Sequence, residues 1–154
     1  NNFGCGDPTN YCAQYKRPPV QLMQAITNWL ISQDYSILQF GPKLKEWVGG
    51  FPTFTPLNGA IHITDLEIRE QAACFSIIKK MISGCTGLYH LMLSVGGKSI
   101  VLHPPESIRM GYMFWDLHYI PQLWLKELPR VKYYDYTTFT GQELPEILNF
   151  LNEI

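Results

Sequence analysis

The chain has 154 residues, a length that fits one domain and allows a sizeable buried core. Apolar residues make up 46% and charged residues 16%, a balance that excludes an intrinsically disordered chain and predicts a weakly charged surface. The formal net charge of -1 gives no general attraction to nucleic acid or to an anionic membrane. Because no segment approaches the roughly 18 uncharged apolar residues of a membrane span, we expect a globular protein without one.

The amino terminus and the cysteines bear on cellular context. The first residues, Asn1 to Gly6, carry neither an initiator Met nor a signal-peptide pattern, so we expect a domain excised from a larger protein or a processed product. Cys5, Cys12, Cys74 and Cys85 are too few for a disulfide scaffold and lack the Cys-x2-Cys spacing of a zinc ribbon. We therefore expect reduced thiols and a cytoplasmic location, with a Cys5–Cys12 bridge as the alternative.

Glycines and prolines near the amino terminus predict an irregular arm over residues 1–19. We expect one globular domain over residues 20–154. An apolar stripe predicts a helix over about 20–33. Its members are Leu22, Met23, Ile26, Trp29 and Leu30. We expect a strand over 35–40, a short helix over 43–48, a loop over 49–59 and a strand over 60–63.

Two capping-box patterns mark later helices. Thr64-x-x-Glu67 predicts a largely buried helix from about Asp65 to Ser83, with Gly84 as its stop. A β-prone run over 130–139 predicts a strand, and Thr140-x-x-Glu143 then opens the final helix. The apolar stripe of that helix consists of Leu144, Ile147, Leu148, Leu151 and Ile154.

Between these helices, residues 88–103 predict an antiparallel β-hairpin. Two β-prone runs flank Gly96-Gly97, and glycine supplies the positive φ of a tight hairpin turn. That register sets His90 directly opposite His103 and sends Ile100 and Leu102 to the other face. We therefore predict an α+β fold, a small mixed or antiparallel sheet packed by about four helices.

The paired histidines suggest three kinds of behaviour. Opposed residues in an antiparallel pair have Cβ atoms about 4.5–5.5 Å apart. His90 and His103 could therefore share a metal ion completed by Glu106 or Asp116. They could instead act as a pH switch near the unperturbed imidazole pKa of about 6.5, or be hydrogen-bonded and inert. Nothing else in the sequence implies a cofactor.

Cys74 is a candidate nucleophile. A cysteine hydrolase or protease needs a thiolate with a histidine nearby, which here would be His90 or His103. The capping box puts Cys74 more than two turns into its helix, where the helix dipole contributes little. A buried structural thiol is the alternative interpretation.

An aromatic segment gives the main functional hypothesis. It comprises Arg109, Tyr112, Phe114, Trp115, Tyr119 and Trp124. Tyr and Trp dominate protein interfaces because they bury a large area and keep a polar tip, although core packing would also explain them. We expect a non-catalytic domain that binds a protein partner through these side chains. The alternative is the thiol hydrolase, and the sequence leaves open whether the chain is an enzyme.

Overall fold

The computed structural model describes residues 18–41, 47–48, 51–52, 55–84, 86–103 and 129–153. Its helices are α2 (Val20–Ser32), α3 (Ile68–Ile78), α4 (Gly87–Ser94) and α6 (Leu144–Asn152). Its strands are β1 (Leu38–Gly41), β2 (Trp47–Val48), β3 (Phe51–Pro52), β4 (Ile61–Thr64), β5 (Lys80–Gly84), β6 (Lys98–His103) and β7 (Val131–Asp135). None of the helices within these ranges combines the length and the apolar character that crossing a membrane requires.

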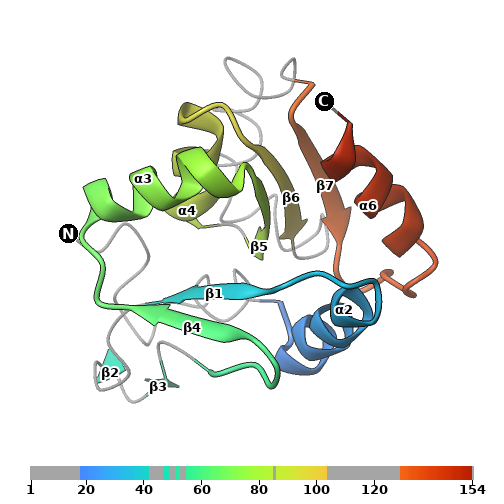
Figure 1. Cartoon of the computed structure of the whole chain (residues 1–154). Helices are drawn as coiled ribbons and strands as arrows, with labels where there is room; N and C mark the ends of the chain where they lie inside the picture. The colour runs from blue at the N-terminus through green and yellow to red at the C-terminus, as the bar shows by residue number, and fades with distance from the viewer. Residues whose placement is uncertain are drawn as a thin grey trace, which may run out of the picture.

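The central feature is a parallel sheet in the order β5-β6-β7. Its register runs from Lys80 beside Lys98 at one end to His103 beside Asp135 at the other. The three arrowheads accordingly point the same way in Figure 1. A separate parallel pair joins β1 to β4, and the two-residue strands β2 and β3 pair antiparallel.

The predicted hairpin over 88–103 is wrong. Residues Gly87–Ser94 form helix α4, and β6 lies between two parallel partners. The α4 sequence buries Tyr89, Met92 and Leu93, which recur at helical spacing and share one face. Gly96 has φ of 82° and ends the helix instead of turning a hairpin. The fold is thus a mix of helices and strands with parallel pairing in its larger sheet.

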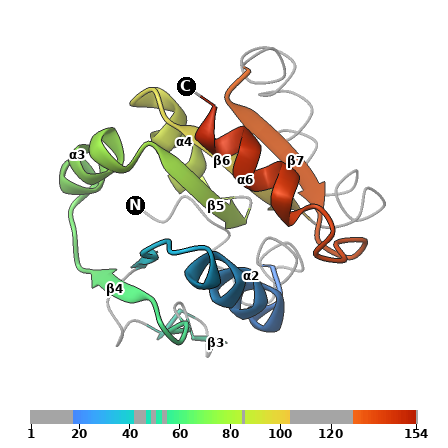
Figure 2. The ribbon, with the colours of Figure 1, turned by 45° about the vertical axis from the view of Figure 1, so that its right-hand side comes forward.

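Two apolar clusters bury β6 on both faces. Ile100 and Leu102 pack with residues of α2 and α6, whereas Val101 packs on the other side with Tyr89 and Leu93 of α4. Figures 1 and 2 both show α6 and α4 on opposite sides of the sheet. Because both faces of β6 are covered, residues 99–102 are all buried, and exposed residues do not alternate with buried ones as they do in a half-exposed strand.

Several other predicted elements are confirmed, with shifted ends. Helix α2 has the predicted apolar stripe, and β4, β7 and α6 lie within or beside their predicted ranges. Strand β1 is shorter than the predicted 35–40 segment and extends to Gly41. The short helix expected over 43–48 is wrong at its end, because Trp47 and Val48 lie in β2.

The long helix predicted over 65–83 is also wrong in extent. Its capping box is formed by Glu67 and Glu70, and α3 ends at Ile78. Lys79 adopts the left-handed conformation (φ 62°), after which the chain enters β5. Ile77, in the last turn of α3, is 83% exposed and does not belong to the core.

Candidate functional site at the carboxyl edge of the sheet

The carboxyl ends of the three parallel strands bring Gly84, His103 and Asp135 to one edge of the sheet. His103 and Asp135 are direct neighbours in the register, and Gly84 lies beside Leu102. The strand arrowheads point toward the part of the molecule that holds α2 and β1 (Figures 1 and 2). In open α/β sheets ligands bind outside this edge, because loops and helix starts converge there.

His103 is the most distinctive side chain at this edge. It is only 7% exposed, and it follows four buried residues, 99–102, that are apolar or small. Alternation along the strand puts its ring on the same face as Val101, the face that α4 covers. The Tyr133 ring of β7 lies 6.5 Å from the His103 ring, centroid to centroid.

The rings continue from Tyr133 into α4. Tyr89, completely buried, meets Tyr133 edge to face at 6.4 Å, and its ring lies 3.9 Å from that of His90. We call His90, Tyr89, Tyr133 and His103 the ring cluster. It places two imidazoles and two phenols on one face of the sheet, where packing restricts their orientation.

Asp135 has a local structural task. Its carboxylate oxygen Oδ1 accepts hydrogen bonds from the Thr137 backbone N–H (2.8 Å) and from the Thr137 hydroxyl (2.7 Å). The His103 carbonyl accepts from the Tyr136 N–H at 3.0 Å, which continues the pairing past the end of β7. Asp135 therefore shapes the loop that borders His103.

The start of α4 follows the carboxyl end of β5 and differs from an ordinary capped helix. Thr86 occupies the N-cap position with extended backbone, yet its side chain forms no capping hydrogen bond. Gly84 is buried, whereas a Cβ atom placed on Gly87 would meet no atom of the described part of the chain within 4 Å. Backbone N–H groups at a helix start favour anionic or polar groups.

The structure separates the two histidines that the sequence was expected to pair. The ring cluster connects His90 of α4 to His103 of β6 through two tyrosines, not by direct cross-strand opposition. Within the described ranges no three His, Cys, Asp or Glu side chains gather as metal ligands do. Glu106 and Asp116, the predicted additional ligands, lie outside those ranges.

Cys74 is a partly buried, free cysteine in the middle of α3. The next residue, Phe75, is completely buried and meets Phe40 of β1 edge to face at 4.9 Å. Cys74 thus lies next to a residue through which α3 contacts the β1–β4 pair. Among the contacts of the described residues, none joins the Cys74 thiol to His90 or His103.

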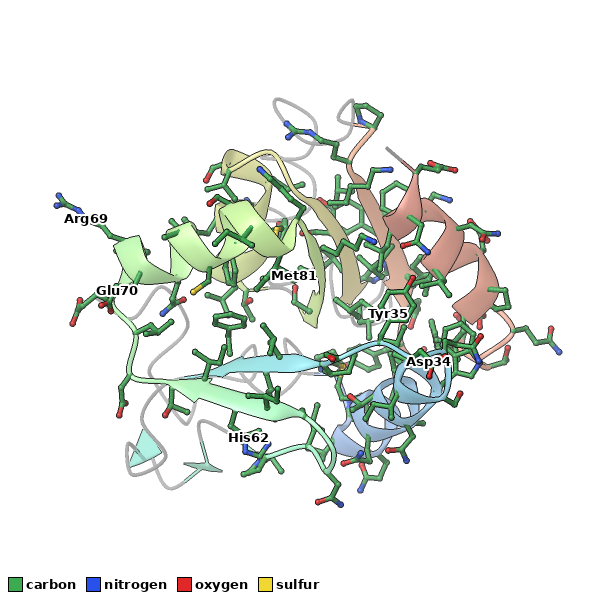
Figure 3. The ribbon with its side chains drawn as sticks, viewed as in Figure 1. Asp34, Tyr35, His62, Arg69, Glu70 and Met81 are labelled. Atoms are coloured by element: carbon green, nitrogen blue, oxygen red, sulfur yellow. The ribbon has the colours of Figure 1, made fainter. Side chains whose placement is uncertain are left out.

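The fourth histidine lies elsewhere. Figure 3 shows His62 on β4, with its side chain directed away from α3. Its Nε2 atom is 3.1 Å from the Leu57 carbonyl oxygen. It is therefore a convenient control for the histidine at the sheet edge.

The aromatic segment proposed as a partner-binding surface lies outside the described residues. This applies to all of its members: Arg109, Tyr112, Phe114, Trp115, Tyr119 and Trp124.

Comparison with protein-family models, with curated proteins and with solved structures finds no match to this chain. Because the sequence predicted a hairpin here, Gly84, Thr86 and Gly87 were not expected to belong to a site. The sequence nevertheless contains the order of segments that is typical of a β-α-β unit. An apolar run is followed by a glycine-containing turn, a short helical segment and a second apolar run.

Proposed function

We propose that the chain binds a small polar molecule at the carboxyl edge of the β5-β6-β7 sheet, with His103 as its main contact. The observation that carries this proposal is the buried imidazole of His103, which follows four buried residues that are apolar or small. Small-molecule sites are lined mainly by apolar side chains, with a few polar groups that fix the orientation of the ligand, and a buried imidazole at a strand end fits that description.

Gly87 supports the same location. It has ordinary negative φ, and a side chain there would meet no atom of the described residues within 4 Å, so neither its conformation nor packing among those residues requires glycine. Glycine within a helix costs about 0.5–1 kcal/mol relative to alanine. A ligand that approaches the backbone closely at the start of α4 would account for this residue.

Nuclear magnetic resonance screening with a library of small polar fragments would test the proposal. We expect hits to shift the His103 ring signals together with the amide signals of Gly84 and Gly87. His103→Gln should weaken these hits at least about tenfold, the usual effect of losing a well-placed hydrogen bond. His62→Gln, on β4, should leave them unchanged. Fragments that bind His103→Gln and the unaltered chain equally would refute the proposal.

Gly87→Ala provides a second test that does not depend on histidine. Because the added methyl overlaps no atom of residues that the structure describes, the variant should be as stable as the parent or slightly more stable. If ligands approach this backbone, the same variant should bind the fragments less tightly. Undiminished fragment binding by Gly87→Ala would remove the start of α4 from the site.

A second candidate is the binding of a protein partner through the aromatic segment around Trp115. Exposed apolar side chains support a role in association: Ile61 is 59% exposed, Ile68 64% and Ile77 83%. A cytoplasmic location accompanies this candidate, and the free thiol of Cys74 fits a reducing compartment. Trp115→Ala should weaken capture of the partner while the melting temperature stays nearly constant. A large fall in melting temperature would instead identify Trp115 as a core residue.

A further inference from the structure

Basic side chains concentrate at the amino edge of the same sheet, opposite the proposed ligand site. The described residues contain six lysines and arginines, of which all but Arg69 lie at or next to the first residues of β5, β6 and β7. These five are Lys79, Lys80, Lys98, Arg130 and Lys132. The edge is thus strongly cationic although the whole chain is nearly neutral.

Three of the five have partners on α6. Lys80 donates to the side chain of Asn152 at 2.6 Å. Lys98 donates to the Phe150 carbonyl at 2.8 Å and lies 3.6 Å from the Glu153 carboxylate. Lys132 forms an ion pair with Glu146 at 2.7 Å. These lysines are accounted for by the packing of the carboxyl-terminal helix.

Lys79 and Arg130 remain, and they converge on Gly96. A Cβ atom placed on Gly96 would lie 3.5 Å from Arg130 Nη1 and 3.7 Å from Lys79 Nζ. Both cationic groups therefore border one small space above an exposed glycine. Apart from Gly96 and its two chain neighbours, no other described residue comes within 4 Å of that point.

The charges of this pair are not neutralised within the described ranges. The ion pairs found there involve Lys98 and Lys132, and neither includes Lys79 or Arg130. Lys79 Nζ donates one hydrogen bond, to the Val95 carbonyl at 2.6 Å, which leaves it two further N–H donors. Two adjacent cations repel each other unless an anion lies between them.

The backbone of Lys79 adds an independent sign of function. It has φ of 62°, a conformation that glycine adopts freely at the end of a helix and that disfavours a larger side chain. Lysine nevertheless occupies the position, and its ammonium group lies beside Gly96. Residues held in such backbone regions cluster at ligand-binding sites.

We propose that Lys79 and Arg130 form an anion site over Gly96 that binds a terminal phosphate group. A phosphate monoester carries about -1.5 to -2 charges at neutral pH, which matches two cations better than a carboxylate does. The Arg130 guanidinium binds two phosphate oxygens with parallel N–H donors, and Lys79 binds the third. This anion site lies at the opposite edge of the sheet from His103, so an experiment can refute either proposed site without refuting the other.

The test is a titration of the amide spectrum with inorganic phosphate, at constant ionic strength and above the second phosphate pKa of about 6. We expect saturable shifts of the Gly96 and Gly97 amides and of the Arg130 side-chain N–H signal. Arg130→Gln and Lys79→Gln should each weaken phosphate binding at least about tenfold, because each removes charge-assisted hydrogen bonds.

Arg69→Gln is the matched control. Figure 3 shows Arg69 projecting from the far end of α3, away from the rest of the molecule. Equal weakening by all three glutamine variants would mean diffuse charge attraction and would overturn the site. Absence of saturable shifts, or equal affinity for acetate, would also overturn it. A phosphoserine peptide that binds more tightly than glycerol phosphate would identify a modified protein as the source of the phosphate, and the reverse order a small metabolite.

Discussion

Gly97 shows how a single missing methyl group can determine local packing. It is buried between α4 and the start of β6, and its φ is not positive. A Cβ atom there would overlap Met92 Sδ and lie 3.0 Å from the Lys79 carbonyl oxygen. Glycine is therefore required by space at this position, whereas Gly96 before it is required by backbone conformation.

Gly97→Ala should destabilise the protein by about 1–3 kcal/mol, the usual cost of overpacking a tight interior. Met92 is completely buried, and the backbone carbonyl on the other side cannot move without disturbing the pairing of Lys98 with Lys79. Chemical denaturation measures the effect, with Gly87→Ala as the control in open space. Equal stability of the two alanine variants would contradict the packing described for Gly97.

At the scale of elements, local pattern specified α2 and α6 but not α4. The stripes of α2 and α6 extend over several turns, so their 3.6-residue period is evident in the sequence. Residues 88–95 are too short and too uniformly apolar to distinguish a buried helix from a strand. Their β-prone composition and the two glycines then favoured a hairpin, whereas packing of Tyr89 and Leu93 against Val101 stabilises a helix.

The contact between β7 and α6 contains a phenol with a strongly raised pKa. The Tyr134 hydroxyl donates to the Glu146 carboxylate at 3.2 Å. Burial, followed by the negative charge of Glu146, raises the pKa of Tyr134 from 10.0 to about 12. Hydrogen bonding and the charge of Lys132 lower the pKa of Glu146 from its ordinary value.

This contact predicts a loss of stability at alkaline pH. Since the pKa of Tyr134 is higher in the folded protein, its contribution is complete below about pH 10 and declines as the pH rises toward about 12. Tyr134→Phe should make the fall in unfolding free energy over this interval shallower. Denaturation midpoints measured at several alkaline pH values test this, and an unchanged slope in the variant would refute it. Glu146→Gln should lower the pKa of Tyr134 only in part, because burial is the larger cause.

At the scale of the whole molecule, the sequence predicted the mixture of helices and strands but not how the strands pair. The alternation of side chains along a strand predicted correctly which residues of β6 share a face, since Ile100 and Leu102 pack on one face and Val101 on the other. The neighbours of β6 are β5 and β7, which meet it across an intervening helix and a long connection. No local pattern encodes that choice, so His103 was placed beside the wrong partner and Asp135 was not expected near it.

Asn152 makes the longest-range polar connection of the described chain. Its side chain bonds the Tyr35 hydroxyl, 117 residues away, and accepts from Lys80 at the start of β5. It thus joins the end of α6 to the segment after α2 and to the sheet. Because these groups are exposed, each hydrogen bond contributes at the lower end of the usual range of about 0.5–1.5 kcal/mol.

Asn152→Ala should therefore lower the free energy of unfolding by about 1–2 kcal/mol, since it removes the bonds to both partners. Hydrogen exchange should accelerate in the last turn of α6 and at the first amides of β5, and more weakly after α2. Asn149→Ala is the control, because Asn149 is an exposed residue of the same type on the same helix. Alanine favours helix at either position, so only the loss of the connection distinguishes the two variants. Equal stability of both variants would mean that the packing of Ile147 and Leu151, without Asn152, holds α6 on the sheet.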